Sequence, residues 1–360
     1  MIIFIFLVLL CALPGAKAAE PGKIFPDYIS RTQTTAINGI FVLLVFFSHV
    51  STYITMAGPL DAAYQTMKSY LGQMVVVTFL FFSGFGMMES ITKKGMAYVK
   101  SIPYRRFCKV LFHMILAVLL FWVVDLLLKK PPALKNVLLA FIGWTSIGNS
   151  NWYIFAVLAL YVIVFLSFIV CKANRWIGAV LTTLLSVAFV YWQMRIGRDS
   201  WTYNTVIVFA AGMWYSLLRA PLERFAGRST PLWFLSFGAL FALYLVFDYR
   251  KGGGIEWYSL WAICFVLVLV LLSMKVKIGN RLLQFFGAHV FSIYILQRIP
   301  MMVFTKLGMA DHRYSFITLS FCATLVLAVL FDTLLEKLDN AIWGRGKQPL
   351  PAPEGKVETT

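Results

Sequence analysis

Long apolar runs separated by short polar segments make up most of this chain. Each run holds about 18–22 residues, the length that crosses the hydrocarbon core of a bilayer as an α-helix. Backbone N–H and C=O groups find no water in hydrocarbon, so these runs must pair their own backbone groups by forming helices. The pattern predicts an all-α, polytopic membrane helix bundle of about ten transmembrane helices. The predicted runs are 36–56, 71–90, 107–128, 151–171, 176–194, 202–219, 231–248, 257–274, 288–307 and 314–335.

Composition supports one membrane domain rather than soluble domains. Hydrophobic residues make up 60% of the chain and charged residues 13%, whereas soluble domains have about 45–50% and about 25%. We expect a membrane domain over 31–340, preceded by an apolar segment, 1–30, and followed by a polar, disordered cytoplasmic tail, 341–360. The five cysteines are scattered, with no C-x-x-C pair and no metal-ligand spacing, so neither a disulfide framework nor a bound metal is expected.

The net charge of +17 comes from lysines and arginines between the apolar runs. They form no basic face on a soluble domain, which argues against nucleic-acid binding. Cytoplasmic loops of membrane proteins are enriched in basic residues. Placing the start of the first span in the cytoplasm gives 18 basic residues on the inside segments and 10 on the outside loops. We therefore expect both ends of the ten-helix unit to face the cytoplasm.

The first thirty residues have two interpretations. A short apolar run with an A-K-A-like end resembles a secretory signal peptide, but a positively charged start is missing. Cleavage would also leave the new N-terminus outside, against the loop charges. An additional short span with its N-terminus outside, or a mis-assigned start, fits better, and the sequence leaves both open.

A histidine and an asparagine lie in the first predicted span. Asn38 and His49 are eleven residues apart, or about three helical turns, so both face the same side roughly 16 Å apart along the axis. A histidine inside a membrane helix is costly to bury and points to function, although a histidine bonded to a neighbouring helix for packing is the simpler alternative. We expect Asn38 near the cytoplasmic entrance, His49 past mid-depth, and one cavity that joins them.

Basic residues crowd the cytoplasmic loop before the third span. Arg105 and Lys109 are four residues apart and would share one face of a helix. Together with Arg106 they are suited to the phosphates of an anionic cofactor, because arginine offers a bidentate fork. Ordinary anchoring of the cytoplasmic boundary explains the same residues equally well.

Polar groups also occur in the second and fourth spans. Ser83 lies among small residues that let membrane helices approach closely, so packing is the simpler interpretation there. Asn151, Trp152 and Tyr153 begin the fourth span at the outer interface. An aromatic belt explains the tryptophan and the tyrosine, whereas the asparagine suggests contact with an extracytoplasmic acceptor.

The ninth span carries Tyr294, Gln297 and Arg298, followed by Pro300. The proline leaves a backbone carbonyl one turn earlier without its helical partner. An arginine at this depth must face the bundle interior or a water-filled cavity. A functional site or a buried ion pair is expected here, and the sequence does not name the partner.

With these residues assembled, the chain resembles the membrane acyltransferase 3 family over about residues 31–340. The ten spans occur in the family's order, and several of its motifs have counterparts here. The matching positions are Gly39 and His49 in the first span, Phe82, Ser83 and Gly84 in the second, Arg105, Arg106 and Lys109 before the third, Trp152 and Tyr153 in the fourth, and Ser292, Ile293 and Tyr294 in the ninth.

The resemblance implies an enzyme of the cell membrane, with the bacterial cytoplasmic membrane as the expected site. It would transfer an acyl group, commonly acetyl, from a cytoplasmic co-substrate, acetyl-CoA or another acyl-CoA, to a hydroxyl of an extracytoplasmic glycan or lipid-linked sugar, without a metal. His49 would be the general base. The carrier would contact Asn38, Arg105, Arg106 and Lys109, and the acceptor Ser83, Asn151, Trp152, Tyr153, Tyr294, Gln297 and Arg298. The acceptor's identity and the oligomeric state stay open.

Two positions depart from the family's pattern. Asn38 stands where the family usually has an arginine, and Gln297 where a histidine frequently follows the late tyrosine. The first change removes a positive charge near the acyl carrier, so the basic cluster before the third span would hold the carrier, or another donor would be used. A transporter or flippase for glycans, lipids or acyl groups, lined by the same polar residues, is the main alternative, and a non-catalytic sensor or scaffold is a weaker one.

Overall fold

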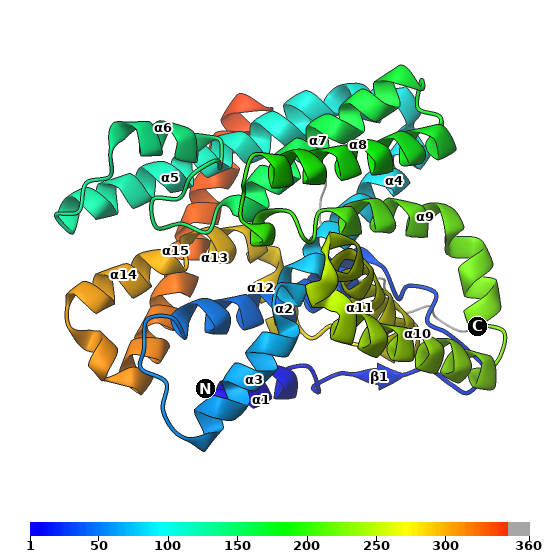
Figure 1. Cartoon of the computed structure of the whole chain (residues 1–360), viewed down its shortest axis with the longest axis horizontal. Coiled ribbons are helices and arrows are strands. Elements are labelled where there is room, and N and C mark those ends of the chain that lie inside the picture. The colour runs from blue at the N-terminus through cyan, green and yellow to red at the C-terminus, as the bar shows by residue number, and fades with distance from the viewer. Residues whose placement is uncertain (345–360) are drawn as a thin grey trace, which may run out of the picture.

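The computed structural model describes residues 1–344 (Figure 1). Most of the predicted tail therefore lies outside the described residues. The structure consists almost entirely of helices, which confirms the all-α prediction. The α-helices are α1 Ile2–Leu10, α2 Arg31–Val50, α3 Pro59–Leu71, α4 Met74–Ile102, α5 Lys109–Leu127, α6 Leu134–Phe141, α7 Trp152–Val170, α8 Arg175–Arg195, α9 Ile207–Ala226, α10 Thr230–Arg250, α11 Ile255–Lys275, α12 Arg281–Ala288, α13 Val290–Leu296, α14 Arg298–Lys306 and α15 Arg313–Ile342. The other elements are the π-helix η1 Pro103–Cys108, the 3₁₀ turns η2 Ser200–Thr202, η3 Lys251–Gly253 and η4 Met309–Asp311, and the strands β1 Lys17–Ala18 and β2 Val276–Lys277.

Each of the ten predicted apolar runs lies mostly on helices, although the first, 36–56, continues past the end of α2 at Val50. Among the described residues, eight helical segments are long and apolar enough to cross a membrane, and one of them, Pro59–Leu127, contains two of the predicted runs. A further candidate span is the pair Arg281–Ala288 and Val290–Lys306, which is bent by 60° at the break between its helices. The multi-pass architecture predicted from the apolar pattern is thus confirmed.

The helix α2 lies at the centre of the bundle. It packs against α4 on one side and against α12 and α13 on another, and α1 and α15 also contact it. Its Ser30 cap accepts a hydrogen bond from the backbone N–H of Gln33, which satisfies one of the free donors at the start of the helix. By contrast, α10 packs mainly on α11 at the periphery and has one buried residue, Trp233. Asn38 and His49 both lie on this central helix.

Glycines allow two helix crossings at backbone contact. A Cβ on Gly39 of α2 would lie 2.1 Å from the carbonyl oxygen of Leu283 in α12, and one on Gly287 of α12 would meet the backbone of α2 in return. Gly84 of α4 and Gly212 of α9 make the same reciprocal arrangement. Small residues are typical where membrane helices pack this closely. Close helix packing, the simpler interpretation of the small residues in the second span, is therefore correct for Gly84.

The N-terminal segment is part of the bundle. Helix α1 packs against α2 and α3, and the ring of Phe4 stacks on Phe47 with centroids 5.2 Å apart. The chain then crosses the bundle and pairs β1 antiparallel with β2, with Lys17 opposite Lys277. We call the end of the bundle that contains β2, η1 and the start of α2 the inner end, and the opposite end, with α3 and the start of α7, the outer end. In Figure 1, α3 lies to the left and β1 to the right.

Candidate active site

A cavity of about 520 Å³ opens at the inner end. Its polar and charged lining comes from α2, α4 and η1, and its apolar and aromatic lining from α4, α5, α7 and α13. This volume falls within the about 300–1,000 Å³ typical of small-molecule sites. The residues that matter below are Arg31, Asn38, Ser83, Arg106, Tyr153 and Tyr294.

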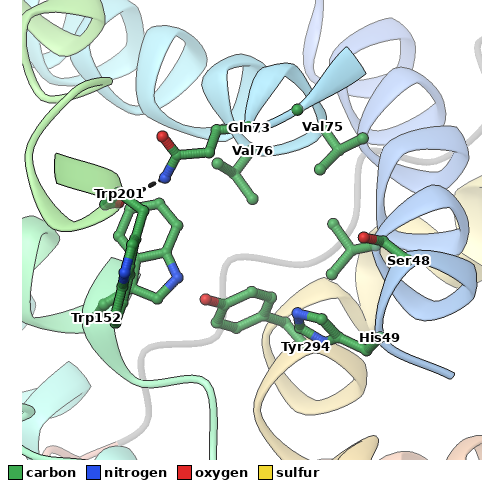
Figure 2. Close-up of a pocket in the computed structure, with 10 residues that line it drawn as sticks. Ser48, His49, Gln73, Val75, Val76, Trp152, Trp201 and Tyr294 are labelled. Atoms are coloured by element: carbon green, nitrogen blue, oxygen red, sulfur yellow. Dashed lines mark hydrogen bonds between the residues drawn. The ribbon is translucent and has the colours of Figure 1, made fainter. Parts of the chain in front are cut away.

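A second cavity, of about 220 Å³, lies at the outer end of α2 (Figure 2). His49 and Ser48 border it on one side, and Trp152 and Trp201 on the other. The two indole rings are T-shaped, with centroids 6.1 Å apart. The side chain of Gln73 donates a hydrogen bond to the backbone carbonyl of Trp201, which fixes the loop at this side of the cavity.

The ring of Tyr294 borders both cavities. It lies 6.4 Å from the ring of His49 and 5.6 Å from the ring of Tyr153, centroid to centroid. Its hydroxyl is buried and has no hydrogen-bond partner among residues 1–344. We predicted one cavity joining Asn38 to His49, but the structure has two, because this aromatic side chain stands between them.

His49 sits in the last turn of α2, on the wall of the outer cavity. Its Nδ1 atom is buried and lacks a hydrogen-bond partner within the described part of the chain. A neutral imidazole with a free nitrogen accepts protons. Arg298, at the start of α14, and Lys68, in α3, are close enough for their charges to act on the ring. His49 therefore lines the outer cavity with two cationic side chains nearby.

The predicted cofactor-binding residues separate into two groups. Asn38 and Arg106 line the inner cavity, and the Asn38 Oδ1 atom is buried without a partner in residues 1–344. Arg105 is exposed outside the cavity lining, and the Lys109 ammonium binds Asp339 of α15 at 2.6 Å. The expected shared face of Arg105 and Lys109 was based on α-helical spacing. The segment Pro103–Cys108 is instead a π-helix, in which hydrogen bonds span five residues and side chains are rotated relative to an α-helix.

The predicted acceptor-binding residues are also divided between locations. Trp152 lines the outer cavity, Ser83 and Tyr153 line the inner one, and Tyr294 borders both. Asn151 lines neither, and its amide donates to the backbone carbonyl of Thr145, which closes the loop before α7.

Gln297 and Arg298 follow Tyr294 along the ninth span. Gln297 is fully buried, and its amide donates to the Tyr294 carbonyl at 3.0 Å. It does not line either cavity. Arg298 has no carboxylate within ion-pair distance among the described residues, so the buried ion pair considered from the sequence does not form there.

Several cavity residues went unnoticed in the sequence, among them Arg31, Gln73 and Trp201. Arg31 lines the inner cavity with Asn38, and the seven-residue spacing between them, two helical turns, was the available signal. Gln73 and Trp201 line the outer cavity from an interhelical junction and from a 3₁₀ turn. No spacing rule connects such positions to His49, because they depend on how distant helices pack.

A family model described as an acyltransferase domain matches residues 35–333. The matched region holds most of the central helix, nearly all of both cavities and the late tyrosine. The fold and the family match together identify an integral, multi-pass membrane acyltransferase, which transfers groups other than aminoacyl groups. The chain belongs to the acyltransferase 3 family, as its motifs suggested, and this supports the enzyme interpretation over the transporter. Comparisons with curated proteins and with solved structures gave no match.

Proposed function

We propose that this acyltransferase moves an acetyl group, or a related acyl group, from a cytoplasmic CoA thioester to a hydroxyl of an extracytoplasmic glycan or lipid-linked sugar, in the bacterial cytoplasmic membrane. His49 is the general base. The position of Tyr294 between two cavities carries the proposal. Arg31 and Arg106 line the inner cavity, and the imidazole of His49 lines the outer one. Donor and acceptor then approach the same point from opposite ends of the bundle.

The inner cavity suits the donor. Arg31 and Arg106 stand on its wall, where guanidinium groups bind phosphates with paired hydrogen bonds. The rest of the lining is mainly aromatic and aliphatic, from residues such as Phe79 and Val157, and this surface suits an acyl-bearing arm better than it suits free water. The phosphates stay at the entrance and the thioester points towards Tyr294.

The outer cavity suits the acceptor. Trp152 and Trp201 offer flat apolar surfaces on which the carbon-bound hydrogens of a sugar ring can rest, while Gln73 and Ser48 add polar groups. Pockets for polar small molecules combine such surfaces with a few polar groups that fix orientation. A hydroxyl on a bound sugar faces His49 across this space.

The proposed reaction is a direct acyl transfer. The acceptor hydroxyl oxygen attacks the thioester carbonyl carbon while His49 takes the hydroxyl proton. The new C–O bond forms, the C–S bond breaks, and the CoA sulfur leaves with the proton that His49 releases.

The test uses the purified full-length protein with radiolabelled acetyl-CoA and a panel of glycans. We expect label transfer by the wild type and its loss in His49→Ala. His312→Ala is the matched control, because this exposed histidine lies in the outer loop before α15 and borders neither cavity. Unchanged transfer in a folded His49→Ala protein would remove the general base from the proposal, and glycan flux without label transfer by the wild type would favour transport.

A further inference from the structure

Two cations at the outer end have no acidic partner within residues 1–344. Neither Lys68 of α3 nor Arg298 of α14 takes part in an ion pair there. Another outer cation, Arg313, is neutralised by a bidentate contact with Asp61. Both residues are half-buried, and the buried Nε atom of Arg298 has no hydrogen-bond partner in the described residues. A partly desolvated charge without a counter-charge is costly, so these two cations favour an anion beside them.

Lys68 is held beside the histidine. Its ammonium donates to the backbone carbonyl of Ser48 at 3.0 Å and to the Ser51 hydroxyl at 2.8 Å. Ser48 directly precedes His49 and lines the same outer cavity. A lysine ammonium has three N–H donors, so one remains available after these two bonds.

Lys68 also borders a further open cavity of about 390 Å³, together with Ser51, Tyr64 and Gln65. No aspartate or glutamate lines this cavity or the one at His49. Ser48 and Lys68 stand between the two spaces, because Lys68 shares a small crevice with Ser48, Gly72 and Val75 of the first cavity. This crevice is only about 10 Å³, so Lys68 forms part of the wall between the two spaces and its charge acts on a group in either of them.

We infer that the outer end binds an anionic group of the acceptor, a carboxylate or a phosphate, at Lys68 and Arg298, while the acceptor's hydroxyl lies at His49. This rests on the proposed function and narrows the acceptor to an acidic or phosphorylated sugar. The tryptophans hold the sugar ring, and the cations select for charge. A neutral sugar would leave both cations without a counter-charge.

Binding without an acyl donor tests this inference separately from catalysis. The probes are glucose, glucuronate and glucose 6-phosphate, measured calorimetrically on the full-length protein in phosphatidylcholine nanodiscs. We expect the two anions to bind at least about 10-fold more tightly than glucose, since each tenfold step in affinity corresponds to about 1.4 kcal/mol. Equal affinity for glucose and both anions would overturn the inference, whether or not acyl transfer is ever observed.

The variants separate charge recognition from other roles. Lys68→Gln should reduce the preference for anions to near unity, and Lys68→Arg should retain it. Lys306→Gln, which removes an exposed outer cation that lines neither the cavity at His49 nor the one at Lys68, should leave this preference unchanged. A folded Lys68→Gln protein with the wild-type preference would contradict the assignment, as would an equal loss of affinity for all three sugars.

Phosphatidylglycerol in the nanodiscs distinguishes the two sources of such an anion. If the acceptor supplies it, the preference for glucuronate and glucose 6-phosphate over glucose persists in this anionic lipid. If the lipid headgroup occupies Lys68 instead, the preference disappears there and remains in phosphatidylcholine. That second result would overturn the assignment to the acceptor.

Discussion

The ring of His49 lies 6.4 Å from the ring of Tyr294, centroid to centroid, at the point where the outer cavity ends. Tyr294 also borders the inner cavity. The proposed base therefore stands next to the side chain that separates the inner cavity from the outer one. An acyl group that enters from the inner end reaches His49 only past this tyrosine.

Replacing Tyr294 by alanine should join the two cavities. Water then reaches a bound thioester from the outer end, so we expect release of CoA without acceptor to rise by roughly 10-fold, the effect of about 1.4 kcal/mol on a barrier. Transfer to a glycan should fall in parallel. Thiol release from acetyl-CoA, followed with and without acceptor, measures both.

Tyr294→Phe is the matched control for this change. It keeps the aromatic ring and removes a hydroxyl that has no partner in the described residues. We expect CoA release without acceptor to stay at the wild-type level. A high rate of this release in Tyr294→Phe would show that the hydroxyl, not the bulk of the ring, protects the bound thioester from hydrolysis.

Removing one cation of the inner cavity should weaken donor binding. Arg106→Gln should raise KM for acetyl-CoA by roughly 10-fold, because a hydrogen bond to a charged group contributes about 1.5–3 kcal/mol. Arg105→Gln, one position earlier and outside the cavity lining, should leave KM near the wild-type value. Steady-state kinetics at saturating acceptor measures the difference, and equal effects of the two changes would contradict the assigned donor site.

The crossing of α2 and α12 should be sensitive to a single methyl group. Gly39→Ala places its Cβ 2.1 Å from the Leu283 carbonyl oxygen, so the helices must separate. Overpacking of this kind costs about 1–3 kcal/mol or more. Gly86→Ala in α4 meets no heavy atom within 4 Å and should be tolerated. Thermal unfolding in detergent compares the two, and equal midpoints would mean that the bundle adjusts at the crossing.

The apolar pattern was sufficient to predict the helices, because the bilayer requires every spanning segment to pair its own backbone. The same pattern could not predict where a helix is interrupted. The ninth run is divided near His289, whose ring bonds Asp332 of α15, and the bend at that point depends on packing rather than on hydropathy. The π-helix at Pro103–Cys108 was not predicted, because the four-residue spacing of Arg105 and Lys109 was interpreted as α-helical.

The candidate site was only partly predictable. Asn38 and His49 lie on the central helix, and their spacing placed them near opposite entrances. Lys109 was predicted to bind the cofactor from its place in the basic cluster before the third span. Its ion-pair partner, Asp339, is 230 residues away in the sequence, and only the fold brings the two together. Trp201 was missed for the same reason, since its contact with Trp152 joins a turn to a distant helix.

The last prediction concerns the position at which this chain departs from its family. Asn38 lines the inner cavity, with a buried oxygen that has no partner in residues 1–344, two helical turns from Arg31. Asn38→Arg adds a third cation to the wall that Arg31 and Arg106 share. If phosphates bind there, KM for acetyl-CoA should fall by about 10-fold, the effect of about 1.4 kcal/mol, whereas the neutral Asn38→Gln should leave it unchanged. A KM that rises in Asn38→Arg would mean that the added charge meets the existing cations without an anion between them, and the donor would then have to bind elsewhere.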